Sequence, residues 1–565
     1  MDGQMTFDFE QRKPIKGYPE LHWTGKRPYT STQYYPAQLK ESYGEPKDGW
    51  MNKIFWGDNL QVMSHLLKDY RGKIDLVYID PPFASSADYV KKIKLKKQTI
   101  SGNSSLFEEK QYTDMWNNDE YLQFIFERII LIKELLSEKG TLFFHCDWRV
   151  SGYARLILDE VFGKDNFLNE IIWNYSGGRI GHNFFGRKHD TIFWYAKTYG
   201  LQTFNYDEVR QEYAESTLRR NQYKNNGSDE RVLNYKPNED GKFPEDVWNI
   251  SIINPFAKER VDYPTQKPEK LLEDVIKAAS NKGDLVFDCF MGSGTTQTVA
   301  MKLGRKFIGA DINLGSIQTT TKRLINAAEG LDSDKYTGFE VYNVNNYDFF
   351  RNPIEAKELL IDALGIQKFD SSTVYDGELD GYMVKIMPTN RIATKADLEE
   401  LKANLPYKTF EKRKEENPNA VVEKIKIVCM GHEADLKASL DQELSAYKLD
   451  IDIVDILRDK SDLQFKREAD ARVEKENGKL VIKEFYPMNL LQKLSMQKES
   501  VEDWRQLVES VFVDWNYDGE TMRPEICDIP GKDELVSGTY DIPITAGKIK
   551  VKITDLLSES LEVEV

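Results

Sequence analysis

The strongest constraint on the fold is an alternation of short apolar runs with amphipathic segments. Residues 73–80 (KIDLVYID) and 284–290 (DLVFDCF) are rich in β-branched and aromatic residues, which is typical of buried strands. Apolar residues recur at helical spacing at 119–138 and 268–280. Strands that alternate with helices predict a doubly wound, mostly parallel sheet with helices on both faces, which is the α/β class.

Four further runs extend the predicted sheet. We expect strands at 141–147, 170–175, 190–197 and 305–313, and we expect Gly140 to end the helix that precedes the first of them.

The same pattern divides the chain into regions. Residues 1–50 are rich in Tyr, Pro and Gly and predict an irregular N-terminal arm. The α/β pattern covers 51–199 and 261–350, and a polar, aromatic and charged insertion occupies 200–260. Residues 351–565 mix strand-like and helical runs, so we expect a separate α+β region.

Composition excludes several classes of protein. The four cysteines lie far apart, which argues against a disulfide framework and a zinc site, and we expect no bound metal. The sequence has no apolar run of membrane-spanning length and no apolar leader, so we expect a cytoplasmic protein without a membrane partner. The net charge of −16 argues weakly against nucleic acid as a partner, but most of the acidic excess lies in 351–565.

A glycine turn joins a strand to a helix at 287–296 (FDCFMGSGTT). Gly292 and Gly294 let a ligand approach the backbone, with the N–H groups of the following helix facing it. Asp311 ends the next predicted strand, where a carboxylate can bind a ribose diol. The third glycine of the dinucleotide fingerprint is replaced by Gln297, and a tight turn without a ligand remains an alternative.

A second motif, Asp80-Pro81-Pro82-Phe83, ends the strand at 73–80. Two prolines stiffen the turn and leave carbonyl groups free to accept hydrogen bonds. Rigid acceptors beside the ring of Phe83 suit a planar base that carries an amino group. The alternative is a strand that is merely stopped by prolines.

Together the two motifs resemble those of the amino-methylating DNA methyltransferases, which use S-adenosylmethionine. Residues 263–268 (YPTQKP) and 57–60 (GDNL) resemble two further motifs of that family. The order of the motifs resembles the β-class, a circular permutation of the class I methyltransferase fold, with a target-recognition segment between catalytic motif and cofactor loop. This resemblance covers about residues 50–350. Three further segments resemble modification subunits of type III restriction systems: LHWTGK at 21–26, TLFFHCDWR at 141–149 and VDWNYDGE at 513–520.

The resemblance implies an adenine-N6 DNA methyltransferase. Asp80 stands where cytosine-N4 enzymes usually carry Ser, and Phe83 stands where Tyr is commoner. Asp80, Pro81, Pro82 and Phe83 are the expected catalytic residues. The residues expected to bind the cofactor are Asp58, Thr265, Lys267, Asp288, Phe290, Gly292, Gly294, Thr295, Thr296 and Asp311.

The resemblance also assigns roles within this set. The target adenine would be flipped out of the duplex and stacked on Phe83. Asp58 would meet the adenine amino group of the cofactor and Asp311 its ribose. Thr265 and Lys267 would meet the carboxylate of its methionine end.

Three other polar segments carry predictions of their own. The basic run at 91–97 (KKIKLKK) is either a solvated face or a phosphate contact. His145 and Cys146 are neighbours on a predicted strand and point to opposite faces, so we expect no metal or nucleophilic role for them. The insertion suits DNA reading through Arg210, Arg219, Arg220, Lys224, Arg231 and Lys236.

The predicted function is site-specific methylation of double-stranded DNA in a restriction-modification or related defence system. If the chain is a type III modification subunit, a separate ATP-dependent restriction subunit must cleave, and 351–565 would serve homodimerisation or docking. The alternatives are a cytosine-N4 or RNA base methyltransferase, a recognition subunit that is active only with a partner, and a dinucleotide-dependent oxidoreductase. The oxidoreductase leaves the motif at 80–83 and the segment 263–268 unexplained.

Overall fold

The computed structural model places most of the chain, and the description below is limited to those residues. Of 88–93 and 107–113 only the backbone is described. The described residues are 5–9, 20–82, 88–93, 107–113, 118–175, 183, 185–213, 238–254, 256–261, 263, 265–331, 336–344, 357, 360–361, 364–369, 374–387, 393, 395–417, 420–429, 436–456, 469–496, 501, 503–531 and 534–565.

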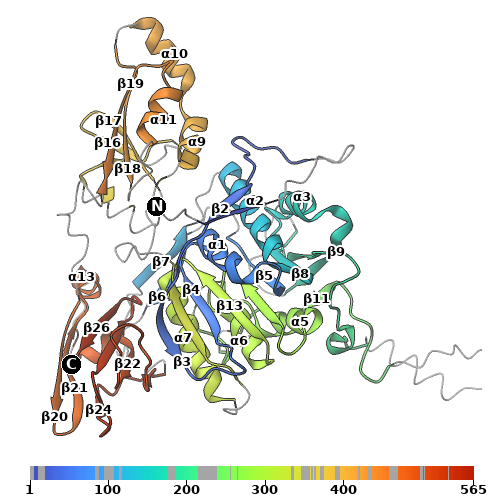
Figure 1. Cartoon of the computed structure of the whole chain (residues 1–565), viewed down its shortest axis with the longest axis vertical. Helices are drawn as coiled ribbons and strands as arrows, with labels where there is room; N and C mark the ends of the chain where they lie inside the picture. The colour runs from blue at the N-terminus through green and yellow to red at the C-terminus, as the bar shows by residue number, and fades with distance from the viewer. Residues whose placement is uncertain are drawn as a thin grey trace, which may run out of the picture.

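A ten-stranded sheet forms the centre of the molecule (Figure 1), in the order β11-β9-β10-β8-β5-β12-β13-β4-β14-β3. Its middle strands are parallel, and β10 and β3 run antiparallel to their neighbours. This arrangement confirms the predicted mostly parallel α/β sheet. Its strands are β3 (Gln38–Tyr43), β4 (Asn52–Trp56), β5 (Ile74–Ile79), β8 (Leu136–Cys146), β9 (Phe167–Asn174), β10 (His189–Ala196), β11 (Val247–Asn249), β12 (Leu285–Asp288), β13 (Lys306–Asp311) and β14 (Phe339–Asn343).

Helices cover both faces of this sheet, as the alternating pattern predicts. One hydrophobic cluster joins one face to α1 (Asn59–Tyr70), α2 (Asn118–Leu135) and α3 (Ser151–Phe162). A second cluster joins the other face to α5 (Glu269–Ala279), α6 (Thr295–Lys302) and α7 (Leu314–Glu329). Along β5, Val77 and Ile79 belong to the first cluster, and Leu76 and Tyr78 to the second, which is the period-two alternation of a strand buried on both faces.

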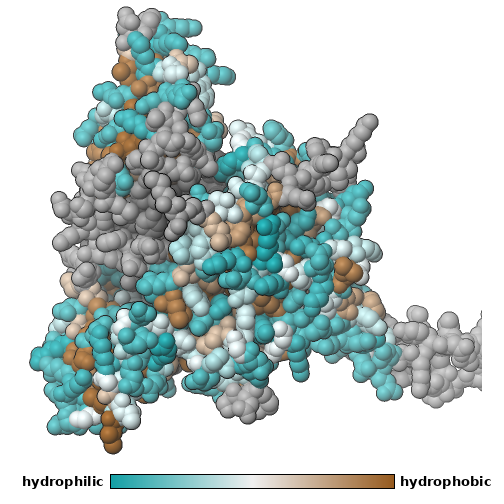
Figure 2. Space-filling model, in the orientation of Figure 1, coloured by the Kyte–Doolittle hydropathy of each residue, from teal (hydrophilic) through white to brown (hydrophobic). Residues whose placement is uncertain are grey.

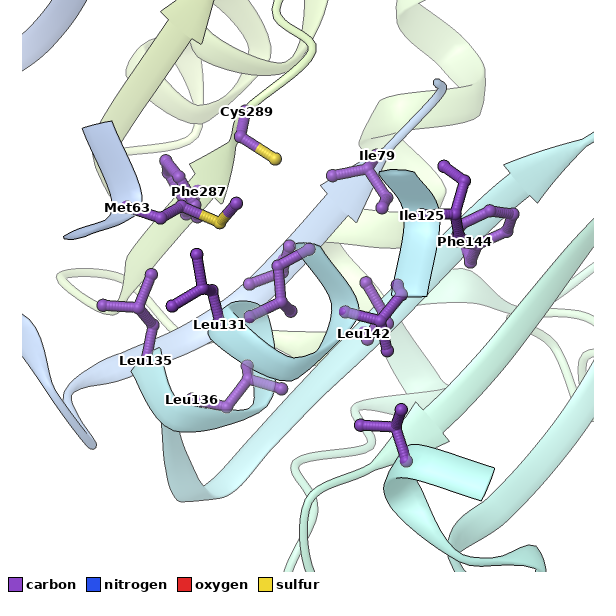
Figure 3. Close-up of a cluster of buried hydrophobic side chains, with 14 of the residues drawn as sticks. Met63, Ile79, Ile125, Leu131, Leu135, Leu136, Leu142, Phe144, Phe287 and Cys289 are labelled. Carbon is purple, nitrogen blue, oxygen red and sulfur yellow. The ribbon is translucent and has the colours of Figure 1, made fainter. Parts of the chain in front are cut away.

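Figure 3 shows side chains of the first cluster packed between the strands and the helices. Ile79 of β5, Phe144 of β8 and Phe287 of β12 meet Met63 of α1 and Ile125 of α2. All five side chains are at most 2% exposed. A core of this density holds the carboxyl ends of the strands in fixed relative positions.

One boundary differs from expectation. The helix before β8 ends at Leu135 instead of at Gly140, and the strand begins at once. Leu136 already pairs with Ile74 of β5. Residues 136–138, which the helical spacing of apolar residues predicted to be helical, therefore belong to the strand. Gly140 lies inside β8, where an added Cβ would be 2.7 Å from the carbonyl oxygen of Ile74.

The N-terminal residues contribute more structure than an irregular arm. β1 (Thr6–Asp8) pairs with β2 (Ser31–Gln33), and β3 forms the outer edge of the main sheet. Trp23 is 3% exposed and packs edge-to-face on Phe126 of α2. These residues therefore belong to the packed α/β domain.

The C-terminal region forms two structural parts. The first is a five-stranded sheet with its own hydrophobic clusters, and it stands at the top of Figure 1. Its elements are β15 (Gln367–Lys368), β16 (Gly377–Leu379), β17 (Tyr382–Ile386), α9 (Lys395–Asn404), α10 (Tyr407–Glu416), β18 (Glu423–Cys429), α11 (Leu436–Glu443) and β19 (Leu449–Asp455).

The second part, residues 469–565, is mainly antiparallel and is called the C-terminal β region here. Strand β25, near the end of the chain, pairs with β22 and β26. Its elements are β20 (Asp470–Glu476), β21 (Lys479–Tyr486), α13 (Met488–Met496), β22 (Val508–Asp514), β23 (Ile526–Asp528), β24 (Thr539–Asp541), β25 (Lys550–Asp555) and β26 (Ser560–Glu564).

The C-terminal β region docks on the outer edge of the main sheet. Met522 exchanges backbone hydrogen bonds with strand β3, donating to the carbonyl of Lys40 and accepting from Ser42, both at 2.9 Å. Lys552 of β25 forms a buried ion pair with Glu41 of β3. Phe512 packs edge-to-face on the β3 residue Tyr43 and belongs to the second core cluster of the α/β domain.

Figure 2 shows mostly hydrophilic residues over the central domain on the face that it presents, with small apolar patches between them. Among the described residues, no helix is both long and apolar enough to cross a membrane.

Candidate functional site

Acidic residues follow four neighbouring parallel strands where these strands end. Asp80 follows β5, Asp288 ends β12, Asp311 ends β13 and Asp58 lies two residues beyond β4. The carboxyl ends of parallel strands meet at one edge of a sheet, which is where such folds bind ligands. The fold therefore brings the motif residues at 57–60, 80–82 and 287–296 together.

The glycine turn after β12 has the geometry that the sequence predicts. Gly292 and Gly294 have φ of 52° and 70°, in the left-handed region that favours glycine. Gly294 is the N-cap of α6, and a Cβ there would be 2.5 Å from the side chain of Thr320. The turn thus brings bare backbone to the N-terminus of α6, where a ligand can approach it closely.

Asp288 accepts two hydrogen bonds from residues of this turn and of the helix that follows it. The Thr296 hydroxyl donates to its carboxylate at 2.6 Å, and the Phe290 N–H donates at 3.0 Å. Burial raises the pKa of Asp288 to about 7. Two of the expected cofactor residues, Asp288 and Thr296, therefore hold each other in this structure.

Asp311 lies beside the turn. Its carboxylate accepts hydrogen bonds from the N–H groups of Gly292 and Asn313, both at 2.9 Å, and burial raises its pKa. The contact with Gly292 fixes the carboxylate against the glycine turn. This is the relative position expected of a group that binds a ribose next to the turn.

Asp58 caps the helix that follows β4. Its carboxylate accepts from the N–H groups of Leu60 and Gln61 and forms an ion pair with Arg128 at 3.3 Å. Asn59 joins this group to the β12 turn, because its side chain donates to the carbonyl of Cys289. Phe290 meets Phe124 of α2 edge-to-face.

The segment before α5 brings a cation to Asp80. Lys267 forms an ion pair with Oδ2 of Asp80. Its nitrogen also lies 3.4 Å from the carbonyl of Thr265, whose φ of 63° is rare for a residue other than glycine. We expected both residues at the carboxylate of the cofactor, and in this structure Lys267 pairs with Asp80, the expected catalytic carboxylate.

Thr295 also has protein partners. Its hydroxyl accepts from Arg323 of α7 at 2.8 Å and donates to the carbonyl of Lys267. Arg323 is 7% exposed and forms an ion pair with Glu269 at 2.9 Å. Arg323 therefore links the start of α5 to the glycine turn, and no sequence motif singled it out.

A buried polar cluster approaches the other carboxylate oxygen of Asp80, and sequence reasoning missed it. His145 of β8 is fully buried, and its Nδ1 lies 2.7 Å from the Tyr78 hydroxyl and 3.9 Å from Oδ1 of Asp80. Its Nε2 lies 3.3 Å from Asp190 of β10, which also accepts from Tyr175 at 3.1 Å. The only signal in the sequence is that His145 and Asp190 each lie at the end of a predicted strand.

Some predicted residues fall outside the described part of the chain. Phe83 is one of them, as are residues 94–97 of the basic run. Arg210 is described and pairs with Asp207 at 2.6 Å. The other basic residues of the insertion lie outside the described residues: Arg219, Arg220, Lys224, Arg231 and Lys236. Within the described part, no three His, Cys, Asp or Glu side chains gather so that they could hold a metal ion.

Comparisons with known proteins match the part of the chain that holds this site. A family model described as DNA methylase (N6_N4_Mtase) matches residues 74–322. Type II methyltransferase M.HpaI of Haemophilus parainfluenzae is 32% identical over 46% of this chain and 71% of its own length. Type II methyltransferase M1.MboII of Moraxella bovis is 35% identical over 35% of this chain and 76% of its own.

One comparison with solved structures covers the same part of the chain. The M1.HpyAVI–SAM complex is 21% identical and covers 48% of this chain and 98% of that one, with a TM-score of 0.31. The family model and the two relatives, with the motifs gathered at one sheet edge, lead to one conclusion: the chain belongs to the N6_N4_Mtase family of DNA methylases and is a DNA methyltransferase.

Proposed function

We propose that this enzyme transfers a methyl group from S-adenosylmethionine to N6 of adenine in double-stranded DNA. The observation that carries the proposal is the position of the Asp80 carboxylate. It lies at the sheet edge that also holds the glycine turn, and Lys267 binds only one of its oxygens. Among the described residues the other oxygen, Oδ1, has no hydrogen-bond partner.

The sheet edge fits the cofactor. Gly292 and Gly294 leave a turn without side chains at the start of α6, and Asp311 stands beside it to bind a ribose. We assign Asp58 to the adenine end, Phe290 to the wall of the site, and Thr265 to the methionine end. When bound, S-adenosylmethionine supplies a methyl group already activated by its sulfonium. The protein then has mainly to place the two reactants in line.

Asp80 and Pro81 would act on the target base. Oδ1 of Asp80 and the carbonyl of Pro81 accept hydrogen bonds from N6, which localises the nitrogen lone pair and stabilises the positive charge that develops there. The adenine must leave the duplex to reach them, and stacking of the flipped base on Phe83 is worth roughly 1–3 kcal/mol. Pro82 keeps the turn rigid.

The choice of adenine rests on Asp80 and on a relative. The protein named DNA adenine methyltransferase YhdJ, of Escherichia coli, is 28% identical over 48% of this chain and 82% of its own length. A restriction-modification role is supported by a probable type III Mod subunit of Haemophilus influenzae, which is 32% identical over 24% of this chain and 16% of its own length. We extend the proposal to a homodimer in the cytoplasm that serves a separate ATP-dependent restriction subunit.

Methyl transfer from labelled S-adenosylmethionine to unmethylated DNA tests the proposal, with Asp80→Ala as the control. We expect N6-methyladenine, identified by mass, at one short sequence that is found by mapping. N4-methylcytosine would overturn the choice of base. A wild-type enzyme that binds the cofactor and methylates no DNA would refute the proposed activity for the isolated chain.

A further inference from the structure

An arginine stacks on an exposed tryptophan at the sheet edge that holds the catalytic carboxylate. Trp148 lies two residues beyond the end of β8, and 45% of it is exposed. Arg187 lies two residues before the start of β10 and is also exposed. The central carbon of its guanidinium is 3.6 Å from the centre of the Trp148 ring. A guanidinium held on a ring keeps its charge and presents its N–H groups around its rim, and the proposed mechanism gives this pair no role.

The order of the strands places the pair beside Asp80. β8 is a parallel neighbour of β5, so both strands end at the same edge of the sheet. β10 runs antiparallel to β8, and Thr191 near its start pairs with Cys146 at the end of β8. The residues that follow β8 and those that precede β10 therefore share the edge where Asp80 follows β5.

The charged side chains of these two segments make the edge basic toward solvent. Asp147 is 5% exposed, and its carboxylate accepts hydrogen bonds from the backbone N–H and from Nε of Arg149, at 2.9 and 2.6 Å. The side chain of Asp190 is 13% exposed. Both acids are thus screened from water, and a polyanion that approaches this edge meets Arg187 and Lys188 first.

An exposed aromatic side chain on the same segment points to the same kind of partner. Phe185 lies two residues before Arg187 and is 98% exposed. Aromatic rings among cations are typical of surfaces that bind nucleic acid strands with unstacked bases. A target adenine that is flipped toward Asp80 leaves such a strand at this edge. The surface therefore fits the DNA strand from which the adenine is flipped.

We propose that Arg187, held in place by Trp148, binds a backbone phosphate next to the flipped adenine; this assignment rests on the proposed methylation of DNA. The contact anchors the strand over β8 and β10, so that the adenine can turn toward Asp80 on the neighbouring strand. A phosphate contact carries no sequence information, so it is separate from the reading of the target. Trp148 is a positioning residue that acts through Arg187.

The salt dependence of DNA binding tests the contact. Full-length enzyme saturated with S-adenosylhomocysteine is titrated onto a fluorescein-labelled duplex that contains the mapped methylation sequence, and anisotropy gives the affinity. Arg187→Gln removes one phosphate contact, so the slope of log affinity against log salt should flatten by about 0.9, and the affinity at about 0.1 M salt should fall roughly eight-fold. Trp148→Ala should weaken binding roughly two- to five-fold, and Trp148→Phe should restore part of the loss.

A matched arginine provides the control. Arg155 stacks on Phe167 at 3.5 Å, and Phe167 begins β9 at the opposite edge of the sheet. Arg155→Gln therefore removes the same charge from a similar stack and should leave the salt slope unchanged. Cofactor affinity should be equal in all variants, because the glycine turn follows β12 on the other side of β5. The urea midpoint of each variant identifies a folding defect.

Uncharged phosphates locate the contact on the DNA. Two duplexes carry a methylphosphonate, one on each side of the target adenine. One of them should weaken wild-type binding about as much as Arg187→Gln does and should have no further effect on that variant. An unchanged salt slope in Arg187→Gln, or equal losses in wild type and variant with both duplexes, would overturn the assignment. A wild-type enzyme that methylates no DNA would refute the proposed function instead.

Discussion

The glycine turn allows a sharp test, because the chain offers a matched pair of glycines. Gly294 and Gly304 both have φ of 70°, so alanine at either position costs about 1–2 kcal/mol of backbone strain. A Cβ at Gly294 would also lie 2.5, 2.6 and 2.9 Å from Cγ2, Oγ1 and Cβ of Thr320, whereas a Cβ at Gly304 meets nothing within 4 Å. Rotation of the Thr320 side chain moves its Cγ2 and Oγ1 but leaves its Cβ in place. The side chain of Thr320 is also fully buried.

Gly294→Ala therefore carries an overpacking cost of about 1–3 kcal/mol in addition to the strain, or about 2–5 kcal/mol in total. Gly304→Ala carries the strain alone. The free energy of unfolding in urea measures both costs, and calorimetric titration with S-adenosylmethionine measures the effect on the cofactor site. We expect weaker cofactor binding in Gly294→Ala and unchanged binding in Gly304→Ala. Equal destabilisation of the two variants, with equal cofactor affinity, would refute the reasoning.

Three further predictions concern single carboxylates and one lysine. Asp80→Ala should abolish methyl transfer and leave cofactor affinity largely intact; near-normal turnover would contradict the assigned mechanism. Lys552→Met should lower the free energy of unfolding by about 3–5 kcal/mol, because it leaves Glu41 as an unpaired buried charge. Adding Glu41→Gln should restore part of that loss, and an additive loss in the double variant would argue against the pair. Burial raises the pKa of Asp288 from 3.8 to about 7, so the stability that its neutral form contributes is present below about pH 4 and is lost as the pH rises through 7. As the pH rises through this range, the free energy of unfolding of Asp288→Asn in urea should come to exceed that of the wild type by up to about 4 kcal/mol. A pH-independent difference would contradict the raised pKa.

Much of the α/β domain could be predicted because its signals are local. The alternation of apolar and polar residues marks each strand, and a strand buried on both faces is recognisable at 73–80. Parallel strands place their carboxyl ends together, so Asp80 and the glycine turn at Gly292 could be assigned to one edge before the structure.

The remaining features depend on which strands become neighbours. His145 and Asp190 meet because β8 lies between β5 and β10, an order that spacing along the chain does not encode. Lys267 and Asp80 are 187 residues apart in the sequence, and local sequence patterns cannot predict an ion pair between such distant residues. The same holds for β3. The sequence predicts an irregular arm there, but the residues of β3 pair with β14.

The docking of the C-terminal β region on β3 has a consequence for synthesis of the protein. Glu41 and its partner Lys552 are 511 residues apart, so the first edge of the sheet is translated long before the residues that cover it. At about 5–20 residues per second, the interval is roughly 25–100 s. For most of that time Tyr43 has been translated, but Phe512, which packs on it, has not. Prematurely terminated chains would therefore keep an uncovered sheet edge, which favours their aggregation.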